Sequence, residues 1–191
     1  LVVNNSFLAK FDPQPLWKVI NNSRCICLHL AGPSGNLDLY VAYFDSALAC
    51  NRKTTTEKIR EYMSPASETL SLVFGDFNFV SSNLDRWNTS STNFSGNKDK
   101  VESEFFLDHL LTPSNLAELF QETPTFVGCR AVSRLDRCYS NHHVATQLTN
   151  DYTCFPLRFQ HGLSDHRPLT FSRTPIRNQV SQYGHKRLPS Y

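Results

Sequence analysis

Apolar and polar residues alternate along several stretches of the chain, as in strands with one buried face. The first such stretch is Ser23–Leu30, and the second is Leu37–Tyr43. Between them lies the sequence AGPSGN, which is rich in turn-forming residues. The range Arg24–Tyr43 is therefore predicted to form a β-hairpin.

A helix followed by a buried strand is predicted next. The capping sequence Thr54–Thr56 precedes apolar residues at helical spacing, namely Ile59, Tyr62 and Met63. The segment Thr69–Val80 then reads TLSLVFGDFNFV, in which an apolar run ends in the polar turn GDFN. This order of elements is typical of α/β proteins.

The GDFN turn is the first candidate for chemistry. Residues two apart in an extended chain project to the same side, so Asp76 and Asn78 are expected to face one volume while Phe77 points into the core. The alternative is an ordinary Asx-rich turn after a strand.

The second half of the chain predicts further elements. The polar range 81–100 is expected to be a long surface loop, Glu102–Leu111 a buried helix, and Thr112-Pro113 the start of a shorter helix that ends at Phe120. Strands are predicted at Ser133–Asn141 and Pro168–Phe171. Residues 174–191 are expected to form a basic, polar, disordered tail.

Composition indicates one domain with a packed core, because 191 residues with 40% hydrophobic content suffice for one. The net charge of +2 is compatible with a polyanionic partner. No apolar run is long enough to cross a membrane, and no signal peptide is visible. The six cysteines lack a C-x-x-C pair and favour free thiols in an intracellular, reducing compartment over disulfides or zinc.

A histidine and an aspartate are predicted to form a pair. Asp136 lies within a strand that should be covered, where an unpaired charge is costly. His166 belongs to the polar sequence LSDHRP, which opens into another apolar strand. A carboxylate beside an imidazole fixes its tautomer and raises its affinity for protons, so Asp136 is expected to be the partner of His166.

Three motifs in order resemble the endonuclease/exonuclease/phosphatase superfamily: GDFN at Gly75–Asn78, SRLDR at Ser133–Arg137 and SDHRP at Ser164–Pro168. Tyr43 matches the position of the active-site tyrosine of that family. The sequence SRLDR, together with DRWN at Asp85–Asn88, is most similar to the apurinic-type endonuclease domains of LINE-type retrotransposons.

The resemblance implies an α/β fold of the DNase I-like kind, a four-layer sandwich of two β-sheets flanked by helices. It implies Mg²⁺- or Mn²⁺-dependent hydrolysis of phosphodiesters, with DNA or alternatively RNA as the partner. His166 would then act on the phosphate or the water and be oriented by Asp136. Asp76 would activate the nucleophile, Asn78 and Tyr43 would hold the phosphate, and Asp165 would bind the metal.

The chain also departs from the family. The family has two earlier strands, one ending in Asn and one carrying a metal-binding Glu, whereas residues 1–173 match only the later part of the family's domain. We therefore expect an N-terminally truncated domain with impaired activity, for which Glu102, Glu104 and Glu122 are poor substitutes. The alternatives are an inert remnant or nucleic-acid-binding fragment and, less favoured, an inositol or lipid phosphatase. An uncovered sheet edge is expected to promote self-association.

Overall fold

The computed structural model describes residues 3, 5–11, 14–33, 35–91, 93–94, 98–141, 152–159 and 162–173. The predicted tail 174–191 lies outside them. Their centre is a six-stranded sheet in the order β1-β2-β3-β4-β9-β6. Its strands are β1 (Leu16–Ile20), β2 (Cys25–Leu30), β3 (Asn36–Tyr43), β4 (Thr69–Asp76), β9 (Asp136–Asn141) and β6 (Leu116–Glu118).

The strand directions bring the ends of three strands together. β2 and β3 form the predicted antiparallel hairpin, β3 and β4 are parallel, and β9 runs antiparallel to β4. The carboxyl ends of β3 and β4 therefore lie beside the amino end of β9, at one end of these three strands. The helix α2 (Ala49–Tyr62) provides the crossover between the two parallel strands.

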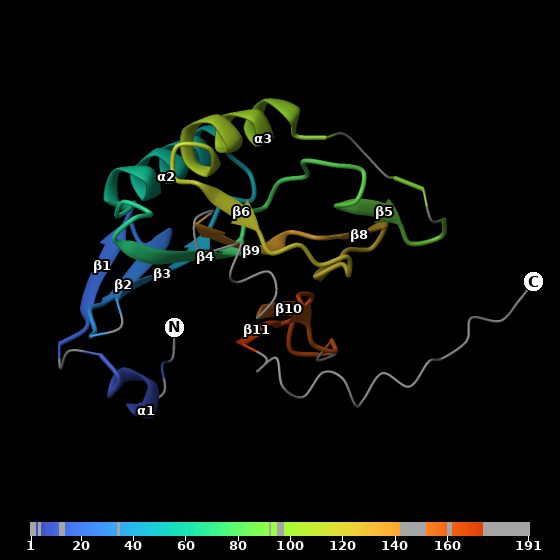
Figure 1. The fold of residues 1–191 in the computed structure, drawn as a ribbon. Helices are drawn as coiled ribbons and strands as arrows, with labels where there is room; N and C mark the ends of the chain where they lie inside the picture. The colour runs from blue at the N-terminus through green and yellow to red at the C-terminus, as the bar shows by residue number, and fades with distance from the viewer. Residues whose placement is uncertain are drawn as a thin grey trace, which may run out of the picture.

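Helices cover one face of the sheet (Figure 1): α2, α3 (Lys100–Phe106) and the π-helical turn η1 (Leu107–Leu111). An aromatic cluster fills the space beneath them. The ring of Phe77 lies 5.1 to 5.4 Å from those of Phe44, Phe106 and Tyr139, measured between centroids. Phe77, which the sequence placed in the core, has no exposed surface.

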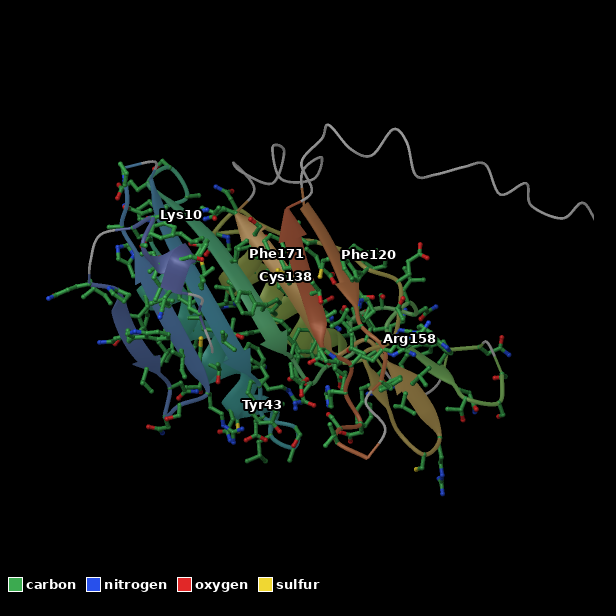
Figure 2. The ribbon with its side chains drawn as sticks, turned by 90° about the horizontal axis from the view of Figure 1, so that it is seen from below. Lys10, Tyr43, Phe120, Cys138, Arg158 and Phe171 are labelled. Carbon is green, nitrogen blue, oxygen red and sulfur yellow. The ribbon has the colours of Figure 1, made fainter. Side chains whose placement is uncertain are left out.

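The opposite face of the sheet is covered by α1 (Asn5–Leu8) and by the hairpin of β10 (Tyr152–Pro156) with β11 (Leu169–Arg173) (Figure 1). A cavity of about 890 Å³ lies between these two covers. Figure 2 looks onto this face, with Lys10 on one side and Phe171 and Cys138 on the other. All three residues line the cavity.

A small third sheet contains β5 (Arg86–Asn88), β8 (Ala131–Ser133) and β7 (Phe126–Val127). Its first strand lies inside the range 81–100, which was predicted to be a loop throughout. The carboxylate of Asp85 anchors this region, since it is fully buried and pairs with Arg134 at 2.6 Å and Arg137 at 3.2 Å.

Two predicted helices differ from the structure. The short helix expected up to Phe120 is wrong, because Leu116–Glu118 instead pairs with β9 as an edge strand. The helix expected from Thr54 begins earlier, at Ala49. Asp45 accepts the N–H groups of Ala47 and Leu48 at 2.9 Å each and so fixes the turn that leads into the helix, whose N-cap residue, Leu48, provides no side-chain cap. Among the described helices, none is long and apolar enough to cross a membrane.

Gly75 provides the first test. It has a φ of +149°, and a Cβ built there would lie 1.8 Å from the carbonyl oxygen of Ala42 on the neighbouring strand. We expect Gly75→Ala to lower the free energy of unfolding by about 3 kcal/mol or more, because backbone cannot move aside as a flexible side chain can. Urea denaturation measures this difference.

Gly35→Ala is the matched control. Gly35 also has a positive φ, of +116°, but nothing lies within 4 Å of its added Cβ. Its cost should be limited to backbone strain of about 1 kcal/mol. Equal losses in the two variants would contradict a steric role for Gly75.

Candidate active site

The candidate site lies where β3, β4 and β9 meet. Asp76 is in register with Tyr43 on one side and with Asp136 on the other. Two carboxylates thus lie directly opposite each other on adjacent strands, an arrangement that is unfavourable unless a cation or proton separates them. On the other side of β4, Gly75 allows a close approach to Ala42 of β3, next to the pair of Tyr43 and Asp76.

The GDFN turn holds Asp76 rigidly. Asn78 adopts a left-handed backbone with φ 51°, which asparagine tolerates better than most residues. Its backbone N–H donates to Oδ1 of Asp76 at 3.0 Å, and its side-chain Nδ2 donates to Oδ2 of Asp76 at 2.8 Å and to the carbonyl of Phe44 at 2.9 Å. Both side-chain N–H groups are engaged, so this geometry makes Asn78 a residue that orients Asp76.

His166 lies between the two carboxylates. Its Nδ1 is 2.8 Å from Oδ2 of Asp136, the partner expected from the sequence, and its Nε2 is 4.0 Å from Oδ2 of Asp76. The backbone of His166 forms a bridge with Phe126, and the two rings lie 5.0 Å apart. The ring is therefore held by a hydrogen bond on one side and an aromatic contact on another.

The chemistry of the pair fixes where the proton lies. An ionised carboxylate only accepts hydrogen bonds, so Nδ1 of His166 donates to Asp136 and Nε2 faces Asp76. The 4.0 Å between Nε2 and Asp76 is too long for a direct hydrogen bond. An oxygen atom in this gap, from a water or a phosphoryl group, could form hydrogen bonds with the side chains of both His166 and Asp76.

Both titrating groups at the gap have raised pKa values. The hydrogen bond to the Asp136 carboxylate is the main cause for His166, because it stabilises the imidazolium. Burial is the main cause for Asp76, and repulsion from Asp136 adds to it. Asp76 therefore holds a proton more readily than a free aspartate does, and His166 keeps its proton to a higher pH than a free imidazole does.

Thr125 is a supporting residue that the sequence did not reveal. It is fully buried, and its Oγ1 accepts the backbone N–H groups of Leu135 at 3.1 Å and Asp136 at 3.0 Å. Its carbonyl accepts the backbone N–H of Arg167 at 2.6 Å. One threonine therefore ties the strand of Asp136 to the loop of His166, and no recognisable motif surrounds it.

Two predicted site residues form no side-chain hydrogen bond with this cluster in the part of the chain that the structure describes. Asp165 nevertheless lies near enough to His166 for its charge to add to the effect of Asp136 on the pKa of the imidazole. Tyr43 is 50% exposed, and its ring lies 5.5 Å from the guanidinium of Arg24. Its phenol forms no hydrogen bond with another residue that the structure describes. The side chain of Asp165 is exposed, while its carbonyl accepts the N–H of Val127 at 3.0 Å.

The described residues do not assemble a complete metal site. Nowhere in this part of the chain do three or more His, Cys, Asp or Glu side chains gather in a way that could hold an ion. Glu102 forms a bidentate pair with Arg52, and Glu104 pairs with Lys100 at 3.7 Å, so neither faces the site.

The layers of the structure are those of a DNase I-like fold, as the sequence predicted. The chain is similar to the endonuclease domain of TRAS1, a telomere-specific non-LTR retrotransposon, with 17% identity and a TM-score of 0.54 over 85% of this chain and 70% of that one. An AP endonuclease from Archaeoglobus fulgidus gives 12% identity and a TM-score of 0.57, covering 83% and 72% of the respective chains.

A third solved structure is D. rerio TDP2 complexed with a single-strand DNA product, with 15% identity and a TM-score of 0.55 over 85% of this chain and 68% of that one. No family model matches the sequence. No curated protein matches it either. At these identities the likeness concerns the fold.

The His166–Asp136 pair provides the second test. We expect Asp136→Asn to lower the pKa of His166, because the amide removes the charged acceptor that is the main cause of its rise. An NMR titration of the imidazole resonances measures the change. At any given pH, the ring signals of His29, which contacts Asp38 instead, should be the same in the variant and in the wild type.

The same pair makes stability depend on pH. The pKa of His166 is raised in the folded state, so the protonated pair stabilises the folded protein. This stabilisation is fully present below the unfolded-state pKa of about 6.5 and is lost as the pH rises through the folded-state pKa. This dependence should weaken in Asp136→Asn. An unchanged titration of His166 in the variant would show that Asp136 does not control it.

Proposed function

We propose that this chain is a nuclease-type phosphodiesterase domain whose substrate is DNA, with RNA as the alternative. The observation that carries the proposal is the cluster of Asp76, His166 and Asp136, in which an imidazole with a fixed tautomer faces a second carboxylate across a 4.0 Å gap. This cluster lies at the edge of a fold that the chain shares with structures of endonucleases. The DNA in the TDP2 complex supports nucleic acid as the substrate.

The residues of the gap suit hydrolysis of a phosphodiester. Asp76, with its raised pKa, would accept a proton from the attacking water. His166, as an imidazolium held by Asp136, would place positive charge against a phosphoryl oxygen. Asn78 would keep the carboxylate of Asp76 in place, and Tyr43 would contact the phosphate from the rim of the sheet.

Dependence on Mg²⁺ or Mn²⁺ belongs to the proposal, with Asp165 as a ligand. Mg²⁺ is usually held by few protein carboxylates, so each one contributes strongly to its affinity. The site brings together two carboxylates, and Asp136 is already engaged by His166. We therefore propose that the chain by itself binds the ion weakly and cleaves slowly.

Self-association is also proposed, through the edge strand β1. Its side chains Leu16, Trp17 and Val19 are 63%, 50% and 59% exposed. An edge strand with large exposed apolar residues is a surface on which a second strand can pair. The exposure of these side chains supports the expectation of an uncovered sheet edge.

Cleavage provides the third test. In Mg²⁺ or Mn²⁺, we expect the isolated chain to nick supercoiled plasmid no faster than the Asp76→Ala/His166→Ala double variant, because its ligand set is short. Gel electrophoresis of the nicked product measures the rates. Robust metal-dependent nicking that the double variant lacks would overturn the proposed impairment.

Binding provides the fourth test and concerns the function itself. We expect the chain to bind a fluorescent 20-base-pair DNA duplex in about 50 mM salt, with an affinity that falls as salt rises because phosphate contacts release counterions. Fluorescence anisotropy measures the binding. Failure to bind duplex or single-stranded nucleic acid, together with phosphate release from inositol phosphates, would replace the nuclease by a phosphatase.

A further inference from the structure

Arg167 is the basic residue of the SDHRP sequence and directly follows His166. Its guanidinium lies over the ring of Phe159, with 4.1 Å from Cζ to the ring centroid. Its Nε is buried and has no hydrogen-bond partner among the residues that the structure describes. Stacking on an aromatic ring fixes the plane of a guanidinium and leaves its N–H edge for another group.

The other buried arginines are neutralised within the fold. Arg52 pairs with Glu102, while Arg134 and Arg137 share Asp85. Arg167 forms no ion pair within the described ranges. A partly buried guanidinium that has no counterion in these ranges is free to pair with an anion from outside the chain.

The location of Arg167 connects it to the candidate site. It lines the same cavity as Asp136, Ser164 and His166. Thr125 fixes the backbones of both Arg167 and Asp136 through its carbonyl and its hydroxyl. Thr125 thus fixes the backbone of Arg167 relative to that of Asp136, and the contact with Phe159 orients the guanidinium.

We propose that Arg167 binds a backbone phosphate of the nucleic acid next to the phosphate that is attacked at His166. The proposal rests on the proposed function. A guanidinium matches two phosphate oxygens with two parallel N–H groups. A chain with successive phosphates can occupy the sites of His166 and Arg167 together, whereas a single phosphate monoester can occupy only one. Arg167 would therefore select a polynucleotide over a small phosphate ester.

The experiment compares Arg167→Gln with Arg158→Gln. Arg158 is an exposed arginine next to Phe159, and it does not line the cavity; Figure 2 shows it well away from Lys10. Anisotropy with the DNA duplex is repeated over a range of salt concentrations. We expect Arg167→Gln to reduce the slope of log K against log salt by about 0.9, the value for one phosphate contact, and to weaken binding several-fold, while Arg158→Gln changes neither.

Arg167→Lys is the control that separates a loss of phosphate binding from a loss of folding. It keeps the charge but loses the planar fork, so we expect it to retain the slope of the wild type and to bind more weakly. Urea denaturation of each variant shows whether the fold is intact. A destabilised Arg167→Gln with an unchanged slope would mean that Arg167 serves the fold, and this would overturn the proposal.

The outcomes separate the two proposals. If the unmodified chain does not bind nucleic acid, the proposed function fails. If it binds and Arg167→Gln has the slope of the wild type, the role of Arg167 alone fails. Equal losses of slope in Arg167→Gln and Arg158→Gln would indicate general surface charge and would also overturn a specific phosphate site.

Discussion

The pairing of Asp76 with Asp136 across two adjacent strands is the constraint on which the site depends. Like charges at directly opposite positions repel, and burial makes the repulsion stronger. The fold offsets this cost by placing His166 between them, with a hydrogen bond to one carboxylate and an electrostatic attraction to the other. The register of β4 and β9 thus adds to the proton affinity of Asp76, whose main cause is burial, and places Asp136 where it raises the proton affinity of His166.

Buried ion pairs keep that register in place. Asp85 accepts hydrogen bonds from the backbone of Ser81 and Ser82 and pairs with both Arg134 and Arg137, at the start of β9. Pairing lowers the pKa of Asp85 in spite of its burial, with Arg137 as the main cause of the lowering. Removing one partner would leave a buried charge uncompensated, so this network specifies a single arrangement of the segments next to the site.

The sequence predicted those parts of the molecule that local pattern determines. The hairpin at Arg24–Tyr43 and the strand before GDFN follow from alternation and apolar runs, and the structure contains both. Leu116–Glu118 was assigned to a helix because a cap and a proline precede it, yet hydrogen bonds to a distant strand outweigh that local preference. The same limit applies to Thr125, whose role comes from segments that meet only in the folded chain.

In the candidate site, the type of a residue does not determine which hydrogen bonds its side chain makes. A sequence can indicate that Asn78 and Tyr43 are polar groups near a phosphate, but it does not show which hydrogen bonds they already make. Asn78 uses both side-chain N–H groups on Asp76 and Phe44, whereas the phenol of Tyr43 faces Arg24 at an exposed rim. A group whose donors are engaged orients its neighbours, and a substrate is met first by groups whose donors are free. Under the proposed function, Asn78 is thus a supporting residue and Tyr43 a contact for the substrate, an assignment that rests on hydrogen bonds seen only in the folded chain.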